Sequence, residues 1–110
     1  MRKLVAFDEG LDSVARAPMY HTFDETFLFF GNNPNDSKDL GGEIEFWLGA
    51  GAEAEKFIIN KPTCIFIPAG LVHCTLVFRN VKRPFMEILI YDKPALVEHR
   101  VDLWPPAYKP

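Results

Sequence analysis

The chain has 110 residues, of which 48% are hydrophobic and 25% charged, an ordinary composition for one globular domain spanning residues 1–110. Its net charge of -3 and its scattered lysines and arginines exclude the clustered basic surface that a nucleic-acid partner requires. No apolar run approaches the roughly 20 residues of a membrane span, so no membrane partner is expected either.

The start of the chain resembles a signal peptide only briefly. Its basic first residues lead into an apolar stretch at residues 4–7, which ends at Asp8 and is shorter than the about 7–15 residues of an apolar signal region. We therefore expect cytoplasmic residence. Cys64 and Cys74 fit reduced strand residues better than a disulfide framework, and their spacing matches no common zinc motif.

Short apolar segments rich in β-branched and aromatic residues recur along the chain, each bounded by Gly, Pro, Asn or Asp. They predict strands at residues 27–30, 43–48, 57–59, 63–67, 74–78 and 85–91. Helical periodicity is weak, because residues 49–56 contain two glycines and residues 11–17 fit either a turn of helix or an edge segment. The predicted fold class is therefore all-β, a sandwich or a barrel.

Two segments depart from the strand pattern. Residues 32–40 form a polar loop full of turn formers. The tail at residues 103–110 contains prolines, which lack the amide donors that a central strand needs. We expect Trp104 and Tyr108 in this tail to pack on the barrel or on a neighbouring subunit.

One predicted strand, residues 43–48, has two different faces. Ile44, Phe46 and Leu48 share one side and predict a core face, whereas the two glutamates and Trp47 share the other. An exposed tryptophan is uncommon, so Trp47 indicates a subunit contact. Together with open sheet edges that need covering, it favours a homodimer.

Two polar clusters, each beside a predicted strand, carry the chemical signal. A turn containing Pro68 and Gly70 lies between two strands and directs His73 back between them. Upstream, His21 and Glu25 lead into another apolar strand. Two histidines and a carboxylate in apolar surroundings predict a divalent metal ion inside a small β-barrel.

The spacing of these residues resembles the sequence motifs of the cupin superfamily, whose members are double-stranded β-helix (jelly-roll) barrels. The second cupin motif, G-x5-P-x-G-x2-H-x3-N, is matched at Pro68, Gly70 and His73. Pro62 stands at its first glycine and Val77 at its asparagine. The resemblance implies a jelly-roll cupin barrel, and the phrase at residues 39–49 looks like that of small bacterial cupins.

The first cupin motif, G-x5-H-x-H-x(3,4)-E-x6-G, is matched in part. His21 is its second histidine and Glu25 its glutamate, while Met19 stands at its first histidine. Its closing glycine is either Gly31 or a later glycine pair. The resemblance covers about residues 18–91 and implies that the N-terminal and Pro-rich C-terminal extensions pack on this barrel core.

The resemblance implies a two-histidine, one-carboxylate metal site made of His21, Glu25 and His73. This donor set suits a divalent first-row ion such as Fe, Mn, Ni or Zn. Met19 adds only a soft thioether, a poor ligand for iron(II) or manganese(II). A second interpretation stays open, an ion-free pocket in which His21 and Glu25 hydrogen-bond directly or through water. Strand alternation allows only one of Asp24 and Glu25 to point inward. The offset in the cupin motif selects Glu25, so the resemblance implies that Asp24 is a solvated turn residue.

Further site residues are expected around this centre. We expect Met19, Phe27 and Phe29 to line the pocket, Lys56 to bind an anionic ligand near the barrel mouth, and Glu25 to act as the catalytic base. The leading hypothesis is a protein that binds a divalent metal ion and a small polar organic metabolite in the barrel and that, if it is catalytic, is a metal-dependent dioxygenase, isomerase or related enzyme. The alternative is a non-catalytic sugar-binding, metabolite-binding or sensory module.

Overall fold

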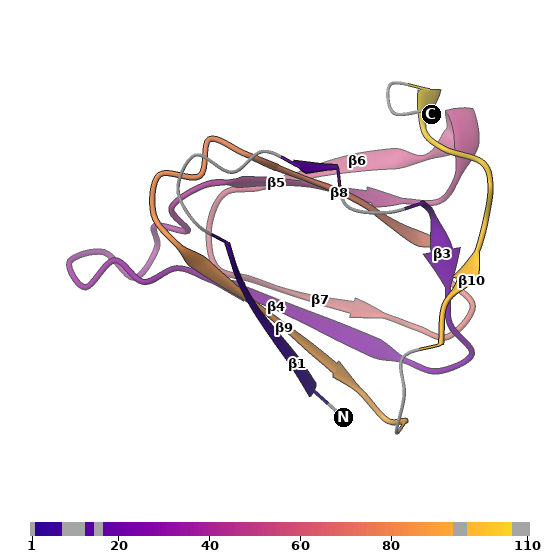
Figure 1. Ribbon diagram of the computed structural model, residues 1–110, viewed down its shortest axis with the longest axis horizontal. Helices are drawn as coiled ribbons and strands as arrows, with labels where there is room; N and C mark the ends of the chain where they lie inside the picture. The colour runs from indigo at the N-terminus through magenta and orange to yellow at the C-terminus, as the bar shows by residue number, and fades with distance from the viewer. Residues whose placement is uncertain (1, 8–12, 15–16, 94–96, 107–110) are drawn as a thin grey trace.

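The computed structural model describes residues 2–7, 13–14, 17–93 and 97–106, with side chains from residue 17 onward. Its strands form two antiparallel sheets that face each other (Figure 1). Sheet A has the order β1 (Arg2–Phe7), β9 (Phe85–Tyr91), β4 (Glu25–Phe30) and β7 (Thr63–Ile67). Sheet B has the order β10 (His99–Arg100), β3 (Met19–Tyr20), β8 (His73–Arg79), β5 (Glu43–Leu48) and β6 (Glu55–Ile59), and β2 (Ser13–Val14) also pairs with β8.

The structure confirms the all-β class. Every strand predicted from an apolar run is present, and β5, β7 and β9 have the predicted bounds. Residues 49–56 contain one turn of 3-10 helix, η1 (Gly51–Glu53), rather than a longer helix. The sequence did not predict β1, although it contains the apolar residues 4–7, nor the two-residue strands β3 and β10. The two-residue strand β2, which pairs with β8, fits the edge segment that was one of the two interpretations of residues 11–17.

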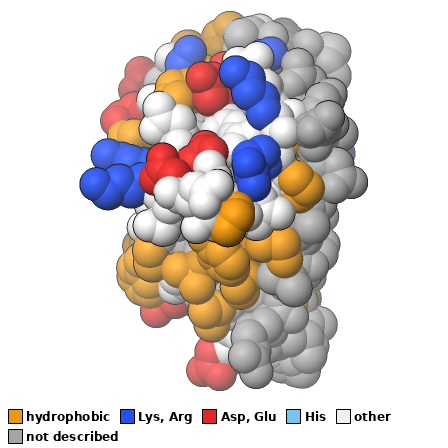
Figure 2. Space-filling view, turned by 90° about the vertical axis from the view of Figure 1, so that its left-hand side faces the viewer, with side chains coloured by type: hydrophobic (Ala, Val, Ile, Leu, Met, Phe, Trp, Pro, Cys, Tyr) orange, Lys and Arg blue, Asp and Glu red, His pale blue; other side chains and the backbone are white. Residues whose placement is uncertain are grey.

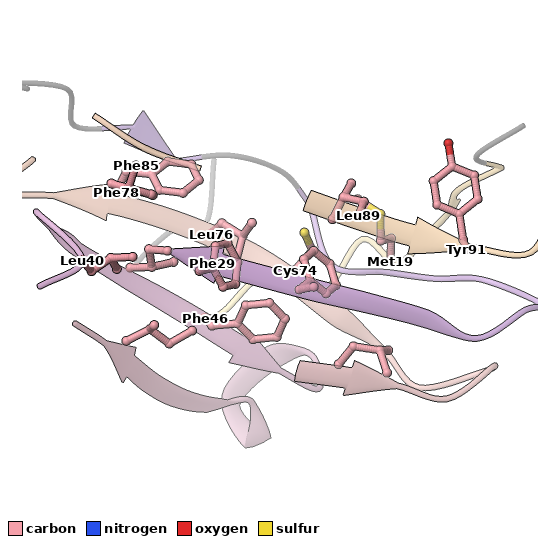
Figure 3. Close-up of a cluster of buried hydrophobic side chains, with 14 of the residues drawn as sticks. Met19, Phe29, Leu40, Phe46, Cys74, Leu76, Phe78, Phe85, Leu89 and Tyr91 are labelled. Carbon is pink, nitrogen blue, oxygen red and sulfur yellow. The ribbon is translucent and has the colours of Figure 1, made fainter. Parts of the chain in front are cut away.

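The hydrophobic core lies between the two sheets (Figure 3). Side chains alternate along β4, so that Phe27 and Phe29 are buried while Phe30 is 40% exposed. From the opposite sheet, Phe46 meets both buried rings edge to face, with centroid separations of 5.2 Å to Phe27 and 6.4 Å to Phe29. Phe85 closes the other end of this layer at 0% exposure. These rings fill the interior from both sheets.

The two sheets do not close into a barrel, which corrects that part of the prediction. The last strand of sheet A is β7, the last strand of sheet B is β6, and these two fully described strands do not pair. The connection at residues 60–62 passes from one sheet to the other, and Pro62 has no amide N–H to donate. The fold is therefore an open jelly-roll sandwich with two edge strands on this side.

The polar loop at residues 32–40 folds back on itself, so that its end lies against Gly31, the residue before it. A Cβ atom on Gly31 would lie 2.2 Å from the backbone oxygen of Asp39, so only glycine fits there. The Asp39 carboxylate accepts hydrogen bonds from Asn33 Nδ2 over 3.0 Å and from the amide of Gly41 over 2.9 Å. The Asn33 bond first, and the Gly41 bond second, lower the pKa of Asp39 below its ordinary value.

The outer face of β5 differs from the prediction. Glu45 is only 9% exposed, and its Oε1 lies 3.3 Å from Arg79 Nε. Trp47 is half-buried rather than exposed, with the ammonium nitrogen of Lys56 at 5.9 Å from its ring centroid. Long side chains of the neighbouring strands β6 and β8 cover this face with their aliphatic stems. The prediction of an exposed Trp47 is therefore wrong.

The C-terminal segment runs along the edge of sheet B. The amide of Val101 donates to the Pro18 carbonyl oxygen over 2.7 Å, and the amide of Gly51 donates to the Leu103 carbonyl oxygen over 2.6 Å. Trp104 is half-buried, and Tyr108 lies outside the described residues. Within the described part of the chain, no helix is long and apolar enough to span a membrane.

Candidate metal centre

Two hydrogen bonds join the turn at residues 68–70 to the segment that carries His21. The amide of Gly70 donates to the His21 carbonyl oxygen over 2.8 Å, and the amide of Ala69 donates to Asp24 Oδ1 over 2.9 Å. Gly70 has a φ of 85°, in the left-handed region that favours glycine. Asp24 is exposed in this turn, on the opposite side from Glu25. These two hydrogen bonds hold the two segments that match the cupin motifs side by side.

His21, Glu25 and His73 meet between the sheets. His21 follows β3, Glu25 begins β4 and His73 begins β8, and their exposed fractions are 2%, 2% and 1%. Glu25 Oε1 lies 3.2 Å from His73 Nε2 and 3.4 Å from His21 Nε2. The three possible ligand atoms all lie within 4.8 Å of one another. This buried group can hold a metal ion.

The second ring nitrogen of each histidine contacts a backbone carbonyl. His21 Nδ1 lies 2.7 Å from the Val97 carbonyl oxygen, and His73 Nδ1 lies 2.9 Å from the Leu71 carbonyl oxygen. Because a carbonyl oxygen only accepts hydrogen bonds, each Nδ1 must carry a proton and donate it. In a neutral imidazole, a proton on Nδ1 leaves a lone pair on Nε2. Both lone pairs are therefore directed at Glu25.

Three hydrogen-bond acceptors thus face one another in a buried space, since an ionised carboxylate also has only acceptors. Such an arrangement is unfavourable unless a cation or an additional proton lies between the atoms. Two ligand atoms at about 2.1 Å from one ion, separated by bond angles of about 90–110°, lie about 3.0–3.4 Å apart. The separations of 3.2 Å and 3.4 Å around Glu25 Oε1 agree with this geometry, while the three ligand atoms together lie within 4.8 Å of one another. The chemistry of this donor set fits a divalent first-row ion.

Aromatic rings enclose the two histidines. Phe23 stacks on His21 with centroids 4.9 Å apart, and Phe27 meets His73 edge to face at 5.7 Å. Phe29 lies one ring further away, 6.0 Å from Phe27. Sequence reasoning missed Phe23, although residues 21, 23 and 25 have the same parity. It could not have identified Val97, whose backbone oxygen leaves no mark in the sequence.

The other two predicted site residues, Met19 and Lys56, lie in different places. Met19 is 5% exposed and lies opposite His73 in the pairing of β3 with β8, within the hydrophobic core (Figure 3). Lys56 is exposed, and its ammonium nitrogen lies over the Trp47 ring on the outer face of sheet B. The structure therefore does not bring Lys56 to the histidines.

The backbone is irregular directly after His73. Cys74 has a φ of 69° and Thr75 a φ of 99°, values that few non-glycine residues adopt. The register between β8 and β5 shifts at this point. His73 and the core residue Leu76 are an odd number of residues apart, so regular alternation would direct them to opposite faces. The bulge allows both side chains to be buried, and the local strain accompanies the placement of His73.

Comparisons with known proteins identify the fold. No family model matches the sequence, and no curated protein matches it. The chain is similar to the WlaRB TDP-quinovose 3,4-ketoisomerase from Campylobacter jejuni, with a TM-score of 0.54 and 15% identity over 92% of this chain and 69% of that one. It is similar to the capsular polysaccharide assembling protein CapF from Staphylococcus aureus, with a TM-score of 0.54 and 14% identity over 91% of this chain and 26% of that one.

A structure of DMSP lyases gives a TM-score of 0.49 at 15% identity, over 91% of this chain and 43% of that one. The chain thus spans less than half of that protein. The open jelly roll and the two neighbours with the higher TM-score show that this chain has the cupin fold. Identity of 14% and 15% shows the fold alone.

Proposed function

We propose that this cupin-fold protein binds one divalent first-row cation through His21, Glu25 and His73 and presents it to a small polar organic metabolite. One observation carries the proposal: both imidazoles donate their Nδ1 protons to backbone carbonyls, which directs two Nε2 lone pairs at one buried carboxylate oxygen. Backbone partners of this kind are the usual means of orienting metal-binding histidines. Three protein ligands leave further coordination positions free for a ligand.

The roles of the surrounding residues follow from their contacts. A bound divalent ion supplies Lewis-acid chemistry and binds oxygen atoms of the ligand. Phe23 and Phe27 keep bulk water from the imidazoles, since they contact both rings. Glu25 is the carboxylate placed to accept a proton from a bound ligand, through the oxygen that does not face the histidines. Met19 completes the apolar wall beside His73.

The direct test is metal analysis of protein purified without a chelator or a histidine tag. We expect about one equivalent of a first-row metal per chain in the wild type, and less than about one tenth of this in the His21→Ala/His73→Ala variant. His99→Ala is the matched control, because this third histidine stacks on Tyr20 at 4.9 Å and takes no part in the group. Substoichiometric metal that is equal in all three proteins would contradict the proposal.

A second candidate function is ligand binding without turnover. The burial of all three ligand residues to 2% exposure or less favours it, because a site this enclosed holds a ligand well but exchanges it slowly. The two fold neighbours named for a TDP-sugar isomerisation and for polysaccharide assembly support sugars as the first compounds to screen. A compound that stabilises the metal-loaded protein and is recovered unchanged favours this function.

Cys64 and Cys74 are both free thiols, which supports residence in the reducing cytoplasm.

A further inference from the structure

The outer face of sheet A is apolar, although the inner face of the same sheet already forms the core. The three strands of this sheet whose side chains are described, β4, β7 and β9, each contribute outward side chains. They form the rows Ile90–Thr26–Phe66, Ile88–Leu28–Cys64 and Met86–Phe30. An antiparallel sheet with one solvated face normally alternates apolar and polar residues, whereas here both faces of β4 and β9 are apolar. This pattern is typical of a sheet that is covered on both sides.

Four of the outward side chains on this face are exposed. Phe30, Phe66 and Ile90 are 40%, 59% and 42% exposed, and Cys64 is exposed as well. The other four are half-buried: Thr26, Leu28, Met86 and Ile88. Figure 2 shows hydrophobic side chains gathered over the lower half of the described surface, where Figure 1 places sheet A. All the lysine and arginine side chains in this view lie above them, and acidic side chains lie both above them and at the lower edge.

The size of the patch fits a dimer interface. With roughly 150–250 Å² for a free aromatic side chain, the exposed fractions of its members sum to about 400 Å² of apolar surface. A stable dimer buries about 800 Å² per partner, of which about 55–65% is apolar, or about 450–500 Å². A monomer rarely exposes a patch larger than a few hundred Å² without a binding role.

We propose that this face of sheet A packs against the same face of a second copy of the chain. The outward side chains of β4, β7 and β9 include no charged group, and Thr26 is their one polar residue. A surface without charge offers little to distinguish different partners, whereas two identical flat aliphatic faces complement each other about a two-fold axis. Two antiparallel sheets pack in this way at a separation of about 10 Å. Exposed Lys61, Asp92 and Lys93 at the strand ends supply a polar rim.

This interface differs from the one that the sequence predicted. Trp47 lies on sheet B, half-buried beneath Lys56, and so it is not part of the proposed contact. The proposal leaves the β6 and β7 edges open. It also leaves His21, Glu25 and His73 between the two sheets, apart from the outer face of sheet A, so we expect dimerisation and metal binding to be independent.

Sedimentation velocity at about 100 µM tests the proposal with a matched pair of variants. Phe66→Glu introduces a charge into the proposed interface, on an exposed edge strand where the fold tolerates it. Ile58→Glu introduces the same charge at a residue that is 51% exposed on β6 of sheet B. We expect the wild type and Ile58→Glu to sediment as dimers and Phe66→Glu as a folded monomer. Far-UV circular dichroism and metal content check that each variant is folded.

Thiol reactivity gives a second measurement on the unaltered surface. Cys64 is exposed on this face and Cys74 is buried, so a thiol reagent reports on Cys64 alone in the native protein. With a micromolar dissociation constant, Cys64 in the wild type should react about tenfold more slowly at 100 µM than Cys64 in Phe66→Glu. A monomeric wild type, equal dissociation by both variants, or equal thiol reactivity in the two proteins would overturn the proposal.

Discussion

Addition of a divalent first-row cation to metal-free protein is expected to raise its melting temperature by roughly 10–20 °C. A ligand that binds only the folded chain stabilises it by about 2.7 kcal/mol at 100 times its dissociation constant and by about 4.1 kcal/mol at 1,000 times. In a domain of this size, each kcal/mol shifts the melting temperature by about 4 °C or more. Thermal unfolding of chelator-treated, dialysed protein, with and without added Mn²⁺, Fe²⁺, Ni²⁺ or Zn²⁺, measures this shift.

Variants at the centre show which side chains the shift requires. His21→Ala/His73→Ala should lose the metal-dependent shift, while His99→Ala should keep it. Glu25→Gln should also lose the shift, because it removes the one anionic ligand of the centre. A shift retained in the double alanine variant, or lost in His99→Ala, would count against the proposed centre.

Phe46→Ala is expected to lower the free energy of unfolding by about 3–5 kcal/mol, because it removes a buried ring and leaves a cavity. Phe46 is 1% exposed and contacts the rings of Phe27 and Phe29. Urea denaturation at fixed metal and protein concentrations measures the change. Both concentrations must be held constant, since metal binding and self-association each add to the measured stability.

Phe57→Ala is the matched control for this substitution. Phe57 lies directly opposite Phe46 in the pairing of β5 with β6, yet it is 45% exposed because β6 is an open edge. We expect its loss to lower the free energy of unfolding by about 1 kcal/mol. Equal losses from the two substitutions would show that the interior of the sandwich is not where these contacts place it.

The fold was predictable because its strands have a strong local pattern. Residues 43–48, 63–67 and 85–91 are apolar, β-branched or aromatic, and bounded by turn formers, so their strands could be located to the residue. The spacing of His21, Glu25 and His73 matched two cupin motifs, and the structure brings the three side chains together. That they bind a metal remains the proposal.

The features that the sequence did not reveal depend on contacts between distant residues. The Val97 carbonyl that orients His21 lies 76 residues away and is a backbone atom. The partial burial of Trp47 depends on Lys56 of the next strand, and the open edges depend on how strands divide between the sheets. The apolar outer face of sheet A could be read from residues 27–30 only once the register with β7 and β9 showed which side chains gather there.

The most direct measurement is a nitrogen-15 spectrum of the three histidine side chains during titration with Zn²⁺, a diamagnetic ion of the predicted set. In the metal-free protein, the account predicts a proton on Nδ1 of both His21 and His73, donated to a backbone carbonyl. It predicts that Zn²⁺ shifts Nε2 of both residues together, at one equivalent, and leaves His99 unchanged. Nδ1 atoms that carry no proton, or Nε2 signals that do not respond to Zn²⁺, would contradict it.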